Sequence, residues 1–225
     1  MRPNGVPPGD LFRRTVVDLV AAATTAPSMH NKQPWRFRFD SASQTISLYA
    51  DPARMLRCGD PDGHALHIGC GAALFDLRLA ATVVGRQPVL RLLPDPGQRL
   101  LLAMVRLAGP CRAQPDEPEL HAAIPARRTN RDPFSSQPVP AGVLAELDEA
   151  VRIEGALLHF PDHQEDIRLL ALARDAERAL LADPAYRAEL ARWAGGTRDR
   201  DGLPGEAVAP RDHRGTAPMR NFTLR

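Results

Sequence analysis

The sequence predicts an α+β fold in which helices pack on one central sheet. Two observations lead to this prediction. Strand-like segments are concentrated before residue 110, together with helical periodicity, whereas the later residues are almost entirely helical in pattern. The chain is also large enough for a substantial core, with 225 residues of which 44% are hydrophobic.

The first expected element is a helix over residues 11–25. Apolar residues recur there at helical spacing, at Leu11, Val16, Leu19, Val20 and Ala23. The helix has to end by Ala26, because Pro27 disfavours helical backbone in the residue before it.

Strands are expected next, at Trp35–Phe39, Thr45–Ala50, Pro88–Leu93 and Leu100–Leu107. The first two are joined by residues 40–43, whose polar composition suits a hairpin turn. Between the second and third strands the periodicity predicts a helix over 65–84, which ends at Gly85 as a C-terminal glycine would end it. Small residues in its first turns allow close approach by another helix or by a ligand.

The second half is expected to be mostly helical. Residues 109–119 contain three prolines and are expected to link a first half, 1–112, to a second, 113–225. Helices are expected after Pro140, around 167–181, and from Asp183-Pro184 to Gly195-Gly196. The pattern of 156–160 suggests a strand, and 197–225 show no periodicity. One strand cannot form a sheet, so this half must pack on the first or be unfinished.

A polar loop stands between the first helix and the first strand. Ser28, Asn31 and Gln33 carry hydroxyl or amide groups, which do not titrate near neutrality. Such a loop suits a flat ligand with hydrogen-bonding edges and is poorly equipped for proton transfer. The alternative is turn chemistry, since Ser and Asn stabilise loops wherever they occur.

A second cluster, residues 127–131, is basic. Arg127, Arg128 and Arg131 place three guanidinium groups within five residues, with Thr129 between them. Guanidinium groups bind phosphate oxygens in a bidentate way. The alternative is an ordinary solvated basic turn.

The run Ala26-Pro27-Ser28-Met29-His30-Asn31-Lys32-Gln33-Pro34-Trp35-Arg36-Phe37 resembles the flavin-contacting signature of the FMN-dependent nitroreductases. With Leu48-Tyr49-Ala50-Asp51, Gly69-Cys70-Gly71-Ala72-Ala73-Leu74 and Arg127-Arg128-Thr129-Asn130-Arg131, it resembles the Acg-like actinobacterial subfamily. The resemblance implies a mixed or antiparallel sheet in α-β-α layers. It also implies FMN, with NADH or NADPH as electron donor, and small nitroaromatic or quinone-like acceptors.

The same resemblance implies roles for single residues. Ser28, Asn31 and Gln33 would contact the isoalloxazine and ribityl parts of FMN, with Pro27 shaping the backbone. Arg127, Arg128, Thr129 and Arg131 would bind the FMN phosphate. No catalytic side chain is implied, because in flavoenzymes the cofactor performs the redox chemistry.

The resemblance also bears on assembly. The Acg-like proteins are fusions of two nitroreductase-like halves, so this chain is expected to be a monomeric pseudo-dimer or a homodimer. Because those relatives continue past the point where this sequence stops, a C-terminal truncation is expected. An alternative function follows, that of a degenerate flavin-binding or flavin-storing protein without significant turnover.

Composition narrows the partners and the compartment. A formal net charge of +2 is too small to indicate nucleic acid or an anionic membrane. No apolar run approaches the roughly 20 residues of a membrane span. Three cysteines outside any CxxC pattern indicate reduced thiols and a cytoplasmic protein. His64, His67 and Cys70 could share a helical face, but without a fourth ligand cluster helix packing is preferred over a metal site.

Overall fold

The computed structural model describes residues 8–130, 137–194 and 201–203, with side chains from Arg13 onward. The helices and strands follow in the order α1 (Pro8–Ala23), β1 (Trp35–Asp40), β2 (Thr45–Ala50), α2 (His64–Val83), β3 (Arg86–Leu92), β4 (Leu101–Pro110), α3 (Glu117–Ala123), α4 (Ala141–Ile153), α5 (His163–Ala182) and α6 (Pro184–Trp193). Short 3-10 turns occupy Met29–Asn31, Pro52–Arg54 and Ile124–Ala126.

The four strands form one antiparallel sheet in the order β1-β2-β4-β3. The hairpin of β1 and β2 pairs Trp35 with Ala50 and Asp40 with Thr45. Each strand lies within three residues of its predicted position, because alternating apolar residues fix both the strand and the face that it buries. The predicted α+β class is confirmed.

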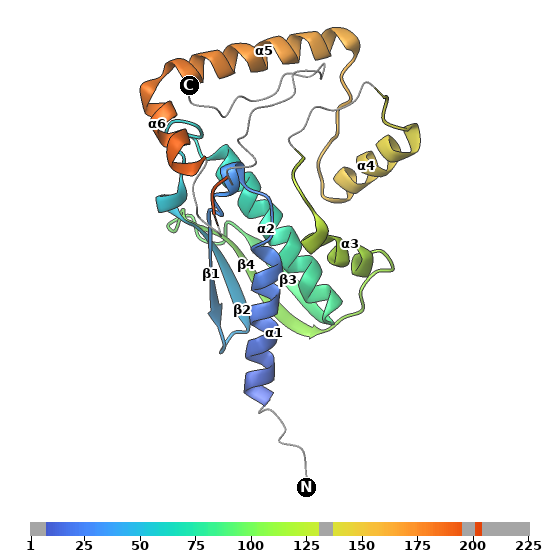
Figure 1. Cartoon of the computed structure of the whole chain (residues 1–225). Coiled ribbons are helices and arrows are strands. Elements are labelled where there is room, and N and C mark those ends of the chain that lie inside the picture. The colour runs from blue at the N-terminus through green and yellow to red at the C-terminus, as the bar shows by residue number, and fades with distance from the viewer. Residues whose placement is uncertain (1–7, 131–136, 195–200, 204–225) are drawn as a thin grey trace.

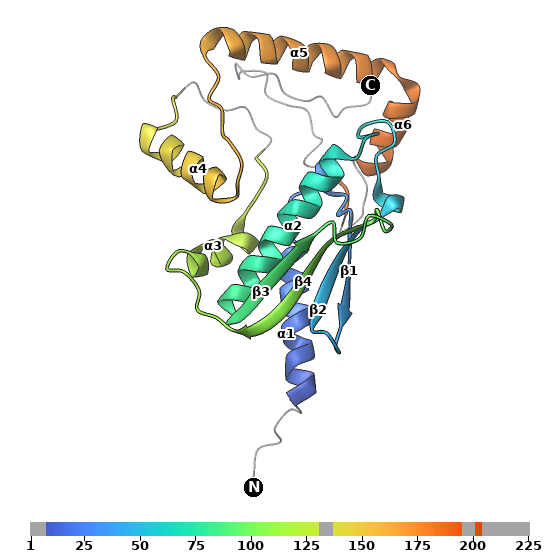
Figure 2. The same ribbon diagram turned by 180° about the vertical axis from the view of Figure 1, so that it is seen from behind.

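The core lies between the sheet and the helices α1 and α2, which cover one face of the sheet (Figures 1 and 2). Leu19, Ile46, Leu77 and Val105 are at most 1% exposed within it. The opposite face carries exposed arginines, namely Arg36, Arg38, Arg91 and Arg106. A second helical layer, as in the α-β-α arrangement, does not cover this face within the described residues.

Helix α2 is the central helix of this core. It ends next to Gly85, whose φ of 77° is the left-handed conformation expected of a C-terminal glycine. Within the described residues α2 alone is long and apolar enough to cross a membrane by length and composition. Half of the window tested is buried inside the protein, as in the core helix of a globular domain.

The second half departs from the sequence prediction in two places. Residues 156–160 form no strand, and the expected linker is shorter than 109–119, because β4 extends to Pro110 and α3 begins at Glu117. Helix α6 begins as predicted, with the Asp183 carboxylate accepting from the N–H of Ala185 at 2.8 Å. The predicted end at Gly195-Gly196 lies outside the described residues.

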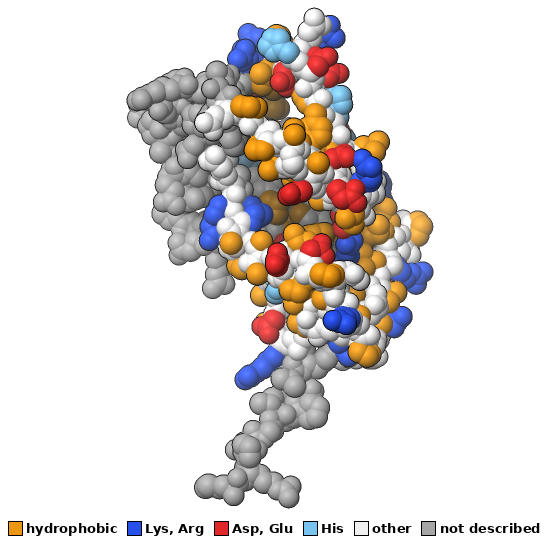
Figure 3. Space-filling model, turned by 90° about the vertical axis from the view of Figure 1, so that its right-hand side faces the viewer, with side chains coloured by type: hydrophobic (Ala, Val, Ile, Leu, Met, Phe, Trp, Pro, Cys, Tyr) orange, Lys and Arg blue, Asp and Glu red, His pale blue; other side chains and the backbone are white. Residues whose placement is uncertain are grey.

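Helices α4 and α5 contribute little to the core. Neither contains a buried residue, and Val143 and Leu147 of α4 are 43% and 49% exposed. Figure 3 views the molecule from the side of α3 and α4, where hydrophobic side chains lie at the surface. Arg78 of α2 holds the end of α4 through both carboxylate oxygens of Glu154, at 3.1 and 2.8 Å.

Of the aperiodic stretch 197–225, residues 201–203 are described and they are not without contacts. Leu203 is 2% exposed, and its N–H donates to the carbonyl of Trp193 at 2.7 Å. At this point the stretch contacts Trp193 of α6 through Leu203 and Asn31 of the first half through Gly202.

Candidate functional site

The polar loop at residues 28–33 has a strained backbone. His30, Asn31 and Gln33 have φ angles of 54°, 54° and 49°. Residues other than glycine seldom adopt this left-handed region, and such conformations persist only where the surroundings impose them. Three of them in four residues, in a loop without glycine, indicate that the backbone path itself is required.

The loop is held closely against α2. Gly69 of α2 faces it, and a Cβ there would lie 3.3 Å from the Cβ of Ser28. The sequence predicts that a helix or a ligand approaches the small residues of α2, but the neighbour of Gly69 is this loop. His30 and Lys32 are buried, at 6% and 3% exposure.

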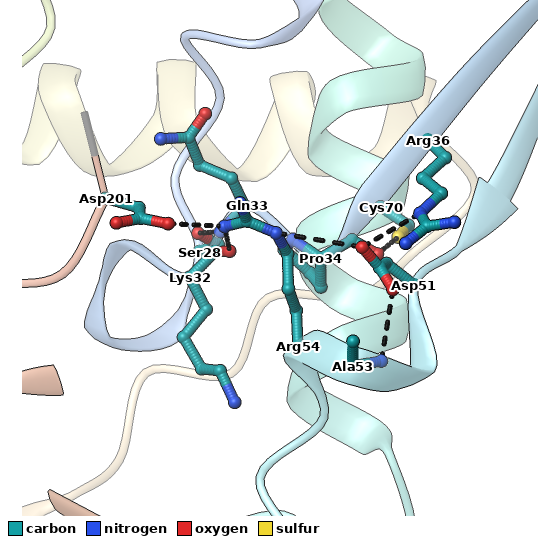
Figure 4. A network of polar contacts seen from close by, with 10 residues as sticks. All are labelled: Ser28, Lys32, Gln33, Pro34, Arg36, Asp51, Ala53, Arg54, Cys70 and Asp201. Carbon is teal, nitrogen blue, oxygen red and sulfur yellow. Dashed lines mark hydrogen bonds and ion pairs between the residues drawn. The ribbon is translucent and has the colours of Figure 1, made fainter. Parts of the chain in front are cut away.

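The structure gives Ser28 and Asn31 contacts within the chain. The hydroxyl of Ser28 accepts from the backbone N–H of Gln33 at 2.9 Å and so closes the loop. The side-chain amide of Asn31 donates to the carbonyl of Gly202 at 3.3 Å. The side chains of Gln33 and Lys32 leave the loop on opposite sides (Figure 4). Turn stabilisation is therefore part of what Ser28 does, whatever ligand the loop binds.

One arginine of the cluster, Arg127, contacts the chain just before this loop. Arg127 donates from Nη2 to the carbonyl of Thr25 at 3.2 Å and from Nη1 to the hydroxyl of Thr129 at 3.3 Å. Thr25 precedes Pro27 by two residues, so the guanidinium group stands where the chain enters the loop. Arg128 donates instead to the carbonyls of Pro125 and Arg127, both at 2.8 Å. Arg131 lies outside the described residues.

A half-buried carboxylate, that of Asp76 on α2, lies within the influence of Arg127. Partial burial raises the pKa of Asp76 to about 6, although the charge of Arg127 acts in the opposite direction. The arginine therefore has an anionic neighbour at neutral pH.

An ion-pair network missed by the sequence analysis supports the other side of the loop (Figure 4). Arg54 donates from Nη1 to the carbonyl of Lys32 at 2.6 Å and to the carboxylate of Asp201 at 2.9 Å. Asp51 accepts from Arg36 at 2.9 Å and lies 3.7 Å from Nε of Arg54. The Asp51-Pro52 pair indicates in the sequence that a helical turn starts there. No sequence pattern indicates that Arg54 pairs with Asp201, which is 147 residues away.

Helix α6 packs against the same region. The carboxylate of Glu189 accepts the backbone N–H groups of Arg57, Cys58 and Gly59 at 2.7, 3.1 and 2.9 Å. The Nζ atom of Lys32, the chain's only lysine, lies 4.4 Å from the centre of the Trp193 ring. Desolvation lowers the pKa of Lys32 to about 8, although Glu189 acts to raise it.

Of the histidines and the cysteine on α2, only Cys70 is packed in the core, whereas His64 and His67 are exposed. The thiol of Cys70 is 1% exposed and donates to the carbonyl of Pro34 at 3.6 Å. Its burial raises its pKa to about 12. His67 contacts the carbonyl of Gly63 at 2.7 Å. In the described part of the chain no three His, Cys, Asp or Glu side chains are grouped to hold a metal ion.

Comparison with known proteins identifies the relatives of this chain. No family model matches it. Putative NAD(P)H nitroreductase Rv3131 of Mycobacterium tuberculosis strain H37Rv is 34% identical over 210 residues, which are 92% of this chain and 59% of that protein. Putative NAD(P)H nitroreductase acg of the same strain is 32% identical over 186 residues, 82% of this chain and 55% of that protein. The chain thus spans less than two thirds of the length of either relative.

Solved structures show a weaker likeness. A putative nitroreductase in complex with FMN from Desulfovibrio desulfuricans is 20% identical, with a TM-score of 0.36, and the match covers 72% of this chain and 89% of that one. A nitroreductase family protein from Streptococcus pneumoniae TIGR4 is 15% identical, with a TM-score of 0.38 and coverage of 64% and 91%. The assignment therefore rests on the sequence relatives. The chain is a homologue of these two mycobacterial proteins, each of which bears the name of a putative NAD(P)H nitroreductase.

Proposed function

We propose that this chain binds FMN and acts as an NAD(P)H-dependent oxidoreductase of the nitroreductase type, of the Acg-like kind. Its acceptors would be small nitroaromatic or quinone-like molecules. The names of its mycobacterial relatives support an NAD(P)H-linked reduction, and the signature at residues 26–37 supports a flavin as the group that performs it.

The observation that carries the proposal is the position of Arg127 at the entrance of the strained loop, with its guanidinium group 3.2 Å from the carbonyl of Thr25. Arg127 is 102 positions from Thr25 in the sequence, and this contact supports a site in which the cation and the neutral amides of the loop act on one ligand. This pair of chemistries suits FMN, whose ring edge is neutral and whose phosphate is anionic.

The two groups of residues would bind different parts of FMN. Pro27, Ser28, Asn31 and Gln33 would hold the ring and ribityl parts, and Arg127, Arg128, Thr129 and Arg131 the phosphate. Bound FMN would supply the hydride chemistry that no side chain of this site can supply. The chain's own residues would bind and orient it, and the hydroxyl of Ser28 fixes the loop. The amide and hydroxyl side chains of the loop do not titrate near neutrality, so no side-chain proton transfer is assigned to them.

A second candidate is a flavin-binding or flavin-storing protein without significant turnover. The exposure of α4 and α5 favours this candidate. Neither helix has a buried residue, so the second half contributes little hydrophobic core around the site.

One experiment separates these functions. The purified full chain is mixed with FMN, freed of excess flavin, and titrated anaerobically with NADH and then NADPH while the flavin absorbance is followed. Bleaching supports the oxidoreductase and also identifies the donor. A yellow protein that neither donor bleaches supports flavin storage. A chain that retains no FMN contradicts both.

The remaining expectations also stand as proposals. The halves 1–112 and 113–225 would form one composite site in a monomeric pseudo-dimer or a homodimer, and the protein would act in the cytoplasm. Light scattering of the flavin-loaded protein distinguishes one chain from two.

A further inference from the structure

Arg54 connects two segments that meet at the loop of residues 28–33. Its Nη1 atom donates to the carbonyl of Lys32 at 2.6 Å, within the loop, and to Oδ2 of Asp201 at 2.9 Å, on the segment beside it (Figure 4). Its side chain is 33% exposed and that of Asp201 19%, so the ion pair is partly shielded from water.

The first contact acts on the strained backbone. Lys32 lies between Asn31 and Gln33, whose φ angles of 54° and 49° are both left-handed. A charged donor on the carbonyl between them, together with the Ser28 hydroxyl on the N–H of Gln33 at 2.9 Å, holds this backbone path. These two side-chain contacts add to the backbone hydrogen bonds of the turn, in which the N–H of Asn31 donates to the carbonyl of Ser28 at 2.9 Å and the N–H of Lys32 to that of Met29 at 3.2 Å.

The second contact acts on the side chain of Asn31. Gly202 follows Asp201, and its N–H donates to the carbonyl of Asn31 at 3.1 Å. Its own carbonyl accepts from the Asn31 side-chain amide at 3.3 Å. The Arg54–Asp201 ion pair therefore fixes the segment that orients the Asn31 carboxamide, and the buried Leu203 anchors that segment on its other side.

We propose that Arg54 is a positioning residue of the flavin site. It acts through the Lys32 carbonyl and through Asp201, and it holds Asn31 and Gln33 in the geometry that the bound ring requires. This inference rests on the proposed function, because it takes FMN as the ligand of the loop.

The chain offers a matched control. Arg36 also pairs with Asp51, at 2.9 Å, but its side chain is 66% exposed and it lies on β1, outside the loop. A loss caused merely by weakening the Asp51 network should therefore appear in Arg36→Ala as well as in Arg54→Ala.

The test compares the full-length wild type with Arg54→Ala, Arg54→Lys, Asp201→Asn and Arg36→Ala. FMN and riboflavin affinities are measured by fluorescence titration, together with the visible spectrum of the bound flavin and the melting temperature of the flavin-free protein. Arg54→Ala should weaken FMN and riboflavin by the same factor, about tenfold or more, since a charged hydrogen bond is lost on the ring side of the site. The spectrum should shift towards that of free flavin.

The other variants complete the test. Arg54→Lys, which keeps the charge, should restore part of the affinity, Asp201→Asn should lose part of it, and Arg36→Ala should match the wild type. If Arg54→Ala does not fold, Arg54→Lys and Asp201→Asn decide in its place, and wild-type affinity in both overturns the inference. Wild-type affinity and spectrum in Arg54→Ala overturn it too, as does an equal loss in Arg36→Ala. A wild type without affinity for either flavin overturns the proposed function itself.

Discussion

Arg127 donates a hydrogen bond from Nη2 to the backbone carbonyl of Thr25, at a distance of 3.2 Å. The two residues are 102 positions apart, and the contact brings the arginine cluster of the second half to the entrance of the loop that begins after Pro27. The cation therefore stands close to the chain segment that leads into the loop with the neutral amides, and its charge also acts on Asp76 of α2.

A substitution at Gln33 can separate the effect of its left-handed backbone from the role of its side-chain amide in flavin binding. Gln33→Gly should keep the free energy of unfolding of the flavin-free protein within about 1 kcal/mol of the wild type, or raise it, because glycine accepts a left-handed φ without strain. Affinity for FMN should fall, because the side-chain amide is lost. Chemical denaturation without flavin and a flavin titration measure the two quantities.

Gln44 provides the matched control for this prediction. Its φ is 53°, close to that of Gln33, but it lies in the turn between β1 and β2, where its side chain donates to the carbonyl of Ser41 at 2.8 Å. Gln44→Gly should leave the flavin affinity unchanged. Wild-type affinity in Gln33→Gly would show that the Gln33 side chain has no part in binding.

Asp76 should make stability depend on pH in the acidic range. Desolvation raises the pKa of Asp76 from its ordinary value of 3.8 to about 6. Between these two pH values the folded chain keeps the carboxyl proton, whereas the unfolded chain has released it. The free energy of unfolding contributed by this group therefore falls as pH rises from about 4 to 6. Asp76→Asn should be more stable than the wild type at pH 7.5, by about 1–3 kcal/mol.

Urea denaturation of the two proteins at several pH values checks this prediction. The difference in their free energies of unfolding should shrink as pH is lowered and vanish near pH 4. Asp62→Asn, on an exposed residue, serves as the control. A constant difference between Asp76→Asn and wild type from pH 4 to 7.5 would exclude Asp76 as the titrating group.

Lys32 should make the free energy of unfolding rise with pH in the alkaline range, opposite to the effect of Asp76 in the acidic range. Desolvation lowers its pKa from 10.5 to about 8, so between these values the unfolded chain binds a proton that the folded chain has lost. Stability from this group therefore rises with pH across the window, by at most about 3 kcal/mol. In Lys32→Met this rise should be absent.

The measurement is the free energy of unfolding of wild type minus that of Lys32→Met, from pH 7.5 to 10.5. Groups common to both proteins cancel in the difference. Because Lys32 is the only lysine, no other ammonium side chain can produce the signal. A difference that does not change with pH would show that the folded protein leaves the ammonium group fully solvated.

The sheet and its two covering helices were predictable from the sequence because their signals are local. Alternation of Phe37 and Phe39 with arginines fixes both strand and buried face, and Gly85 marks the end of α2. The strand predicted at 156–160 is wrong because it was also inferred from a local pattern alone. Its short apolar run resembles a strand, but no neighbouring strand pairs with it within the described residues.

The candidate site was predictable only in part. The residues of the loop and of the arginine cluster stand in recognisable motifs, but their meeting through Arg127 and Thr25 is a property of the folded chain. The contacts of Arg54 with Asp201 and of Glu189 with residues 57–59 join segments more than 120 positions apart. No local sequence pattern predicts such partners, because an ion pair or a side-chain contact with the backbone can form between many different positions of a chain.

The central claim is that the two halves build one FMN site, with the loop on the ring and the arginine cluster on the phosphate. The measurement that tests it most directly is the affinity for FMN and for riboflavin, which lacks the phosphate, in wild type and in Arg127→Ala. Arg152→Ala, on an exposed arginine of α4 that pairs with Asp148, is the control. All three proteins are titrated without electron donor.

The wild type and Arg152→Ala should bind FMN more tightly than riboflavin. Arg127→Ala should lose about tenfold or more of its FMN affinity, since a charged hydrogen bond to phosphate is removed, while its riboflavin affinity stays nearly the same. Equal losses for the two flavins, or equal wild-type affinities for them, would contradict the account.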